Sequence, residues 1–333
     1  MPLTIRDLEP ADLDVAAGLL LEDARQRQAA NPTLWTLAAK ARDKITATIS
    51  AALGQDNPPF RQKWLLAEAD GEAIGITHTI LLPVPPIYAG AFGRPGLIME
   101  DCFLRDDAPD GTLQTLFEAA EADLIEAGAR ILLGSSVPGG VWEQAYAAPD
   151  YDPLTLYFAK TGLRSPQELQ DVRPANAADV PAIVASSAEN RQILFDLNAF
   201  WKPHPDADAR FGAWMEKSLT LPDRDMFVSE VGDTVTGYAI SQPATPLHFP
   251  PPHDISAIGV IDDYYHSDLA DPERLQNDGG AAASLLQPAE AALQARGNTA
   301  ALVVCPAAWL SKIAILKDAG YENAITWFKK RQV

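Results

Sequence analysis

Hydrophobic and polar residues alternate in two stretches of the chain, residues 64–77 and 226–239, and a Gly/Asp pair interrupts each stretch. Alternation with a period of two is typical of strands that have one buried face, and glycine beside aspartate at the break is typical of a tight turn. We therefore predict two β-hairpins of the same kind, which lie 162 residues apart.

A strand and a helix precede each hairpin and begin with the same residues. Arg6 and Asp12 have counterparts in Arg173 and Asp179, each 167 residues further along the chain. In both places a short strand contains the arginine, and the aspartate stands where an amphipathic helix begins, so that its carboxylate can cap the helix. The chain thus predicts the same opening twice.

More segments follow each hairpin in the same order. A buried strand with two adjacent carboxylates comes first, then a helix that ends at a glycine, and then an apolar strand. The matching strands are 98–103 and 260–265, followed by 131–133 and 301–304. The last match is a helix that we expect to end at Gly162 in the first copy and at Gly320 in the second. Five matches in one order predict a duplication.

The duplication predicts two domains, at 1–164 and 171–333, joined by a linker at 165–170. A Ser-Pro pair at the start of the linker disfavours continuation of the preceding helix. The first copy has little room for a closing hairpin before the second begins. We therefore expect the strand at 169–173 to serve both domains.

The order within each copy is strand, two helices, hairpin, long strand, helix, strand, helix and terminal strands, and it resembles the GNAT superfamily of acyl-CoA-dependent N-acetyltransferases. The resemblance covers nearly the whole chain and implies an α/β fold of two tandem GNAT domains, each a mixed, mostly antiparallel, splayed sheet flanked by helices. Its motifs are the Ile-Arg and Val-Arg openings and residues 276–281, Gln-Asn-Asp-Gly-Gly-Ala, which match the family's Gln/Arg-x-x-Gly-x-Gly/Ala loop. The architecture is similar to that of mycothiol synthase, which has one degenerate and one active copy.

The family's loop holds acyl-CoA, and the second copy preserves it better. Glycines let backbone N–H groups approach a pyrophosphate, and the following helix offers its positive N-terminal end; an ordinary flexible loop is the alternative. The resemblance implies that acetyl-CoA, as co-substrate, contacts this loop and two splayed strands, at Ile261, Gln276, Gly279, Gly280, Ala281, Ala282 and Val304. The equivalent segment of the first copy, 105–111, has three aspartates and no glycine at the turn. We expect that copy to have lost CoA binding and Asp110 to be a helix N-cap.

Acyl transfer to an amine requires a base, because the amine must lose a proton. Asp262 and Asp263 end the fourth strand of the second copy, and alternation directs at most one of them to the substrate. Two solvated strand-end residues are the alternative. Glu100 and Asp101 hold the same place in the first copy, where we expect catalysis less because of its poorer loop.

The resemblance also implies an acid, a tyrosine four residues before the glycine that closes the last helix. That position is Leu316 in the second copy and Phe158 in the first. Tyr264 or Tyr265 can substitute from the fourth strand, although a buried aromatic residue is the commoner meaning of either. A thiolate can also leave without an acid, because the pKa of a Cys-type thiol is only about 8.5.

The composition excludes several classes of protein. A net charge of −19 argues against nucleic-acid binding; it can favour a cationic amine or serve solubility alone. No apolar run approaches the roughly 18 residues of a membrane span, and no signal peptide is visible, so we expect a cytoplasmic protein. Cys102 and Cys305, like the three histidines His248, His253 and His266, match no metal pattern, and we expect no metal.

These observations predict an N-acetyltransferase that transfers acetyl from acetyl-CoA to the primary amine of an unidentified small molecule. Its site would lie in the second copy, walled by the interface between copies, where residues 201–205 and Trp214 either line the acceptor pocket or pack as a loop. The alternatives are a non-catalytic acyl-CoA or small-ligand binding protein with this fold, and a structural pair that binds neither. We expect a monomer whose two domains imitate a dimer.

Overall fold

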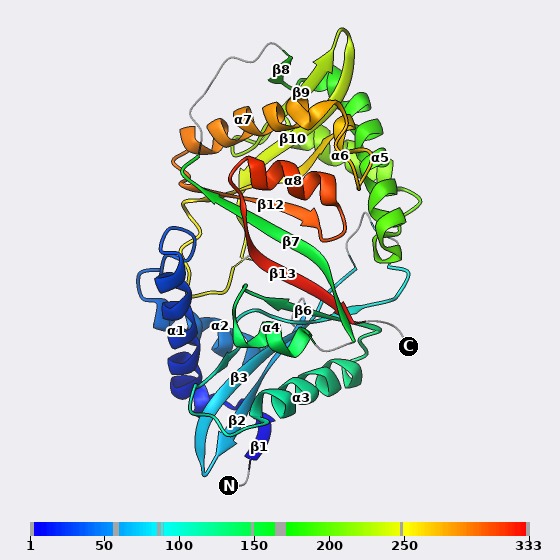
Figure 1. Ribbon diagram of the computed structural model, residues 1–333. Helices are drawn as coiled ribbons and strands as arrows, with labels where there is room; N and C mark the ends of the chain where they lie inside the picture. The colour runs from blue at the N-terminus through cyan, green and yellow to red at the C-terminus, as the bar shows by residue number, and fades with distance from the viewer. Residues whose placement is uncertain are drawn as a thin grey trace.

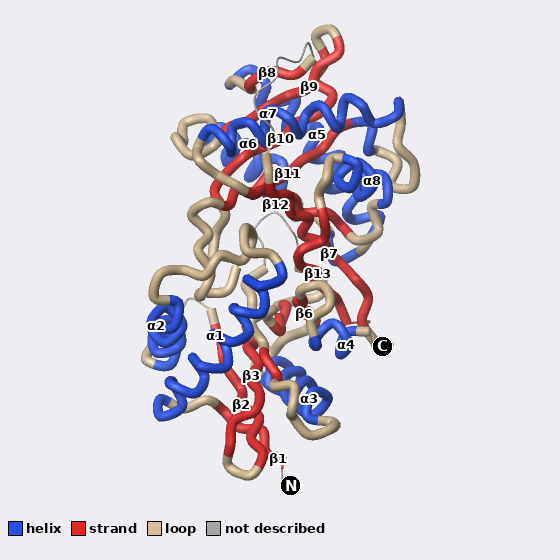
Figure 2. Tube along the Cα trace, turned by 60° about the vertical axis from the view of Figure 1, so that its left-hand side comes forward, coloured by secondary structure: helices blue, strands red, loops and turns tan. Residues whose placement is uncertain are grey.

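The protein was analysed as a computed structural model, which describes residues 3–55, 60–84, 88, 90–147, 150–163, 171–246 and 249–330. One mixed sheet of 13 strands runs through both halves, with helices on its faces (Figures 1 and 2). The strands are ordered β1-β2-β3-β4-β6-β13-β7-β12-β11-β10-β9-β8, and β5 pairs with β3. The predicted α/β fold is thus confirmed.

The first half contains seven strands and four α-helices among its described residues. In chain order they are β1 (Leu3–Asp7), α1 (Leu13–Ala30), α2 (Ala41–Leu53), β2 (Arg61–Ala69), β3 (Glu72–Leu81), β4 (Pro95–Ile98), β5 (Phe103–Leu104), α3 (Thr112–Glu126), β6 (Ile131–Ser136), α4 (Val141–Tyr146) and β7 (Tyr151–Thr161). Apolar side chains alternate along β2: one set packs against α1 and α2, and the other against α3 and α4.

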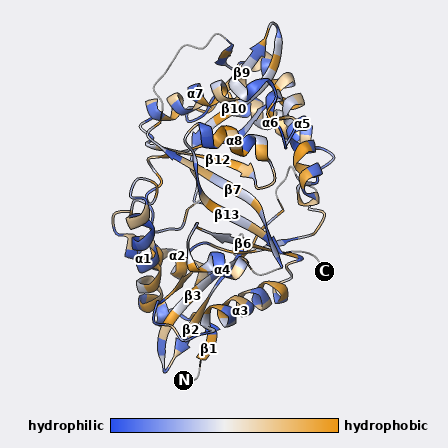
Figure 3. Ribbon diagram, in the orientation of Figure 1, coloured by the Kyte–Doolittle hydropathy of each residue, from blue (hydrophilic) through white to orange (hydrophobic). Residues whose placement is uncertain are grey.

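The second half repeats this order. Its elements are β8 (Val172–Pro174), α5 (Val180–Leu197), α6 (Ala207–Ser218), β9 (Asp225–Val231), β10 (Thr234–Pro243), β11 (Ile258–His266), α7 (Gly280–Ala295), β12 (Ala300–Pro306), α8 (Leu310–Asp318) and β13 (Glu322–Lys330). Short 3-10 turns precede α1, α5 and α7 and follow α5 and β11. Figure 3 shows β12 as hydrophobic, as expected for a strand covered on both faces.

The predicted hairpins are confirmed as β2–β3 and β9–β10. Asp70 and Gly71 both have positive φ, 53° and 81°, as a tight hairpin turn requires. Asp12 and Asp179 stand immediately before α1 and α5, but neither caps its helix with its side chain. Each carboxylate instead accepts two hydrogen bonds from the arginine six residues earlier.

The two halves exchange their last strands. β7 of the first half pairs with β12 of the second, from Thr161 opposite Ala300 onward, and β13 of the second half pairs with β6 of the first. β7 and β13 also pair with each other, antiparallel, at the centre of the sheet (Figure 1). The strand between β6 and β7 therefore comes from the other half of the chain.

The exchange corrects two predictions. The helix expected to end at Gly162 is wrong: residues 151–161 form β7, so Phe158 and Tyr157 lie on a strand, and the counterpart of α8 is α4. Pro153 disfavours a helix interior here, because proline lacks the backbone N–H that a helix requires. The strand expected to serve both domains is also wrong, since β8 pairs with β9 at the far edge, and residues 164–170 lie outside the described chain.

Candidate active site

A cavity of about 570 Å³ opens in the first half, where two parallel strands separate. β4 and β6 pair as far as Ile98 and Gly134, and beyond that point β6 continues beside β13. The chain after β4 turns away to form β5 on β3. The cavity is lined by α1, by the segment from Glu100 to Ala108, and by the residues that follow β6 into α4.

A bulge places carboxylates at the mouth of this split. Four residues, 99–102, lie opposite two residues of β3 because the pairing stops at Ile98 and resumes at Phe103. An excess of residues on one strand disrupts the ladder and redirects side chains. Glu100 lines the cavity, whereas Asp101 is buried elsewhere, 2.8 Å from Nδ1 of His78.

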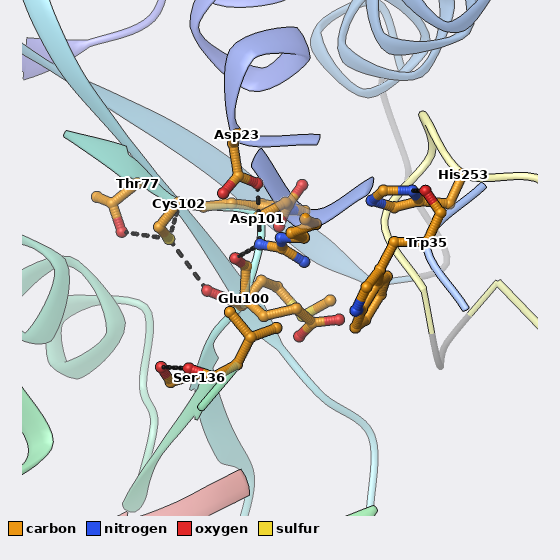
Figure 4. Close-up of polar contacts among 12 residues, drawn as sticks. Asp23, Trp35, Thr77, Glu100, Asp101, Cys102, Ser136 and His253 are labelled. Carbon is orange, nitrogen blue, oxygen red and sulfur yellow. Dashed lines mark hydrogen bonds and ion pairs between the residues drawn. The ribbon is translucent and has the colours of Figure 1, made fainter. Parts of the chain in front are cut away.

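A charged cluster occupies the inner end of the cavity. Arg27 on α1 forms an ion pair with Asp23 at 2.9 Å, and its guanidinium donates to the backbone carbonyl of Glu100. Figure 4 shows Asp23, Glu100 and Trp35 gathered around the same space. Burial raises the pKa of the Glu100 carboxyl, and raises the pKa of Asp23 to about 7. The Asp23 carboxyl can therefore exchange protons near neutral pH.

The loop after Glu100 also differs from the prediction. Gly111, with φ of 82°, is the N-cap of α3, just as Gly279, with φ of 67°, is the N-cap of α7. The first copy therefore does have a glycine at this turn, and Asp110 is not the cap. The mismatch arose because the second loop is six residues longer. Arg105 pairs with Asp107 at 2.8 Å, which lowers the pKa of that aspartate and neutralises one of the acidic groups.

The two aspartates predicted as candidate general bases in the second half lie inside β11, at a bulge opposite Ala239. Asp263 has φ of 55° and accepts a hydrogen bond of 2.9 Å from Asn190 on α5. Asp262 accepts one of 3.0 Å from Gln242. Burial raises the pKa of both, that of Asp263 to about 6. The two side chains are half-buried in the middle of a strand and hydrogen-bonded, and they are not solvated strand ends.

Two side chains of the second half, Lys312 and Trp309, bond to the backbone of β11 and of the turn that follows it. The ammonium of Lys312 donates to the carbonyl of Tyr264 at 2.7 Å, and the indole of Trp309 donates to the carbonyl of Leu269 at 2.9 Å. Both side chains are buried. The loop after β11 is hydrogen-bonded to α8, since Ser311 N donates to the carbonyl of Pro272 at 2.9 Å. These two buried side chains lie beside the strands along which the acetyl-CoA arm is expected in the second half.

Three of the seven predicted cofactor residues of the second half are buried: Ile261, Gly279 and Ala282. A Cβ on Gly279 would lie 2.5 Å from Ile315 Cδ1, so this glycine is required by its left-handed backbone and by packing against α8. Ile261 and Ala282 are fully buried, and Tyr264 donates its hydroxyl to the carbonyl of Ala282 at 2.6 Å. Three predicted residues, Gln276, Gly280 and Ala281, surround the exposed start of α7, and Val304 is half-buried on β12.

Three of the remaining candidates from the sequence, His253, His266 and Cys305, are buried among other side chains. Burial lowers the pKa of His253 to about 4, and burial raises the pKa of Cys305 to about 12. His266 is buried beside Asp268, and His248 lies outside the described residues. In the part of the chain that the structure describes, no group of three or more His, Cys, Asp or Glu side chains could hold a metal, and no helix is both long and apolar enough to cross a membrane.

Loops from each half cross to the other half. Trp35, after α1, packs with Phe249 and with residues of β11 and β12, and its carbonyl lies 3.2 Å from Nδ1 of His253. Trp201, after α5, packs against Tyr88 with ring centroids 5.3 Å apart. The first residue of the segment at 201–205, Trp201, is therefore packed against another loop. Arg27 and Trp35 carried no sequence motif; only their placement beside the split strands reveals them.

Comparison with known proteins identifies the fold. No family model and no curated protein matches the sequence. A GCN5-related N-acetyltransferase from Sphaerobacter thermophilus is 14% identical over 98% of this chain and 95% of that chain, with a TM-score of 0.58. The GCN5-related glucosamine N-acetyltransferase region of a fungal multi-domain β-N-acetylglucosaminidase is 14% identical over 99% of this chain and 38% of that chain, at 0.53. A tandem GNAT protein from the clavulanic acid biosynthesis pathway is 14% identical over 99% and 98%, at 0.48.

The chain has the GNAT fold. Structures at this low identity establish the architecture and leave the substrate open. The internal repeat of the chain makes this a tandem GNAT fold, since each half of the sheet supplies the same series of elements. In each GNAT half the fourth and fifth strands separate, and the described residues form the 570 Å³ cavity at the separation in the first half.

Proposed function

We propose that the protein is an acyl-CoA-dependent N-acyltransferase, which transfers acetyl from acetyl-CoA to the primary amine of a small molecule in the first-half cavity. The observation that carries the proposal is the position of Glu100, which lines a cavity at the split between β4 and β6 of a GNAT fold. This assigns the reaction to the opposite half from the one that the sequence favoured.

The cavity suits an extended acyl-CoA arm. It continues from Arg27 and Glu100 past Ser136 to Ala108, just ahead of the N-terminus of α3. An arm lying between separated strands can hydrogen-bond to their free edges in the manner of an added strand. The N-terminal end of α3 then favours the phosphates, because its backbone N–H groups and dipole attract anions.

Glu100 is the proposed general base. Its carboxyl is buried in the cavity, and its raised pKa brings it closer to the working pH at which a base is most effective. The amine transfers a proton to Glu100, and its nitrogen forms a bond to the thioester carbon. The carbon–sulfur bond then breaks, and the CoA thiolate leaves and takes, through water, the proton that Glu100 accepted, so that the carboxylate is regenerated. Backbone N–H groups at the bulge stabilise the charge on the carbonyl oxygen.

The second half is proposed as scaffold. Lys312 and Trp309 are buried beside β11, whereas its β13 completes the sheet beside β6, and His253 holds the loop that carries Trp35. Acetyl-CoA contacts at Gln276, Gly280 and the other predicted residues of that half remain an untested prediction.

Release of free thiol from acetyl-CoA in the presence of an amine panel tests the proposal. We expect amine-dependent thiol release by the wild type. The Glu100→Gln variant should lose roughly 10²–10⁴-fold in kcat while it binds acetyl-CoA as before, because only the proton acceptor is removed. Asp262→Asn, at the equivalent position of the second half, is the matched control and should leave kcat within about twofold of wild type.

Two results would contradict the proposal. Loss of activity in Asp262→Asn with retention in Glu100→Gln would place the reaction in the second half. Binding of acetyl-CoA without thiol release from any amine, in wild type and both variants, would favour the alternative function of a non-catalytic acyl-CoA binding protein.

A further inference from the structure

Arg27 has hydrogen-bonding capacity that the described residues do not use. Its Nη2 forms the ion pair with Asp23 and donates to the Glu100 carbonyl. Its Nε and Nη1 are buried and have no hydrogen-bond partner among the described residues, although the side chain is only 4% exposed. Buried guanidinium donors are normally satisfied, so an unsatisfied set beside a cavity indicates a missing acceptor group.

The guanidinium is held in place from several sides. Asp23, one turn earlier on α1, orients it, and the ring of Trp35 lies 5.4 Å from its Cζ atom. Trp35 is fixed by the second half through His253 and through backbone hydrogen bonds from Ala38 to Pro252 and from Asp254 to Thr36, each of 2.8 Å. A cation positioned in this way is suited to recognition of an anionic group such as a carboxylate.

The cavity therefore presents a cation and an anion side by side. Arg27 donates to the backbone carbonyl of Glu100, and both residues line the cavity. The guanidinium and the Glu100 side chain are therefore neighbours in the cavity wall. Asp23 is already paired with Arg27, which leaves Glu100 as the anion available to an ammonium group. A ligand that matches this wall has an amine and a carboxylate separated by a short distance.

We infer that the acceptor is an α-amino acid, or a molecule that ends in one, with its carboxylate on Arg27 and its amine directed to Glu100. The inference rests on the proposed function and names the substrate class of the same site. A simple amine would leave both buried donors of Arg27 without partners, whereas the carboxylate of an α-amino acid can accept a hydrogen bond from Nη1, and the two ends of the ligand neutralise both charges.

Matched pairs of substrates test the inference with the wild-type protein. Thiol release from acetyl-CoA is measured with histidine and histamine, tyrosine and tyramine, tryptophan and tryptamine, and lysine and cadaverine. In each pair the amine lacks only the carboxylate. We expect kcat/KM to be at least tenfold higher for the acid in every pair that is turned over. Equal or better use of the decarboxylated amines, or no turnover of any acid, would overturn the inference.

A substitution of Arg27 separates recognition from a structural role. In Arg27→Lys the point charge remains, but the paired donors are lost, so KM for the acid should rise at least tenfold while kcat changes less and the preference within each pair falls. Arg25→Lys, on the exposed face of α1, is the control and should leave KM unchanged. An equal loss for acid and amine in Arg27→Lys would overturn recognition of a carboxylate by Arg27. If that variant fails to fold, the wild-type pairs decide.

The failure of this inference is distinguishable from failure of the proposed function. Turnover of simple amines by a protein whose Glu100→Gln variant is inactive would retain the acyltransferase and remove the amino-acid acceptor. Absence of acetyl-CoA binding in a titration of the wild type would remove both.

Discussion

Asp263 keeps an ionisable side chain in the interior of the second half, and the ionised form is costly there. Burial raises its pKa from 3.8 to about 6, with the neighbouring Asp262 as a second cause. A carboxyl whose folded pKa exceeds its unfolded value stabilises the fold at low pH, and that contribution is lost as pH rises from about 4 through about 6. The residue also has positive φ, which asparagine tolerates well.

Asp263→Asn should therefore stabilise the protein above pH 6. Asparagine avoids burial of a charge and still offers an oxygen to Asn190, which donates to Asp263 at 2.9 Å. We expect the free energy of unfolding at pH 8 to rise by about 1–3 kcal/mol, since each pKa unit corresponds to about 1.4 kcal/mol. At pH 4.5 the difference should fall to about a third of its value at pH 8, because the unfolded carboxyl is then largely ionised and the folded one is not.

Urea unfolding of the variant and the wild type at pH 4.5 and pH 8 measures this effect. Asp233→Asn, in the exposed turn between β9 and β10, is the control and should show the same small difference at both pH values. A variant less stable than the wild type at pH 8 would show that the Asp263 charge is compensated.

Individual residues also show which parts of the candidate site could be predicted from the sequence. The sequence repeat makes Glu100 and Asp101 equivalent to Asp262 and Asp263, and in the structure both pairs lie at a bulge in the equivalent strand. It could not show that Lys312 would be buried against β11, because a lysine on a helix normally faces solvent. Arg27 was missed for the related reason that its role depends on contacts with segments distant in sequence.

At the scale of elements, the exchange of β7 and β13 could not be predicted from hydrophobic periodicity, because periodicity does not reveal which strands will pair. Each strand pairs with strands from both halves, so its partners are set by the whole fold. The hairpins β2–β3 and β9–β10 were predicted because their turns and alternation are local. In β7, burial on both faces removes the clean alternation that marks a one-sided strand.

The exchange predicts that neither half folds alone. Without the second half, β6 and β7 lose β13 and β12, and the exposed strand edges favour aggregation. We expect fragments 1–168 and 169–333 to be insoluble when each is produced separately and to co-purify as a one-to-one complex when they are produced together. Gel filtration and light scattering check this outcome. A soluble, cooperatively unfolding monomer of either fragment would contradict it.

At the scale of the whole molecule, we propose that the two duplicated halves have different roles. Both halves keep the GNAT order of elements, but the first half has an open cavity at its strand split, and in the second Trp309 and Lys312 are buried beside β11. The second half still contributes to the proposed site, because it supplies the sheet neighbour of β6 and holds the loop of Trp35. We propose that the chain acts as a monomer with an internal pseudo-dimer.

Isothermal titration of acetyl-CoA against three proteins tests the central claim, that the acyl-CoA site lies in the first half. Ala108→Glu adds a carboxylate at the end of the cavity nearest α3, and Gly280→Glu adds one at the start of α7, where open space surrounds the glycine. The account predicts one binding site in the wild type, at least tenfold weaker binding by Ala108→Glu, and wild-type binding by Gly280→Glu. Weakened binding in Gly280→Glu alone, or no binding by the wild type, would contradict it.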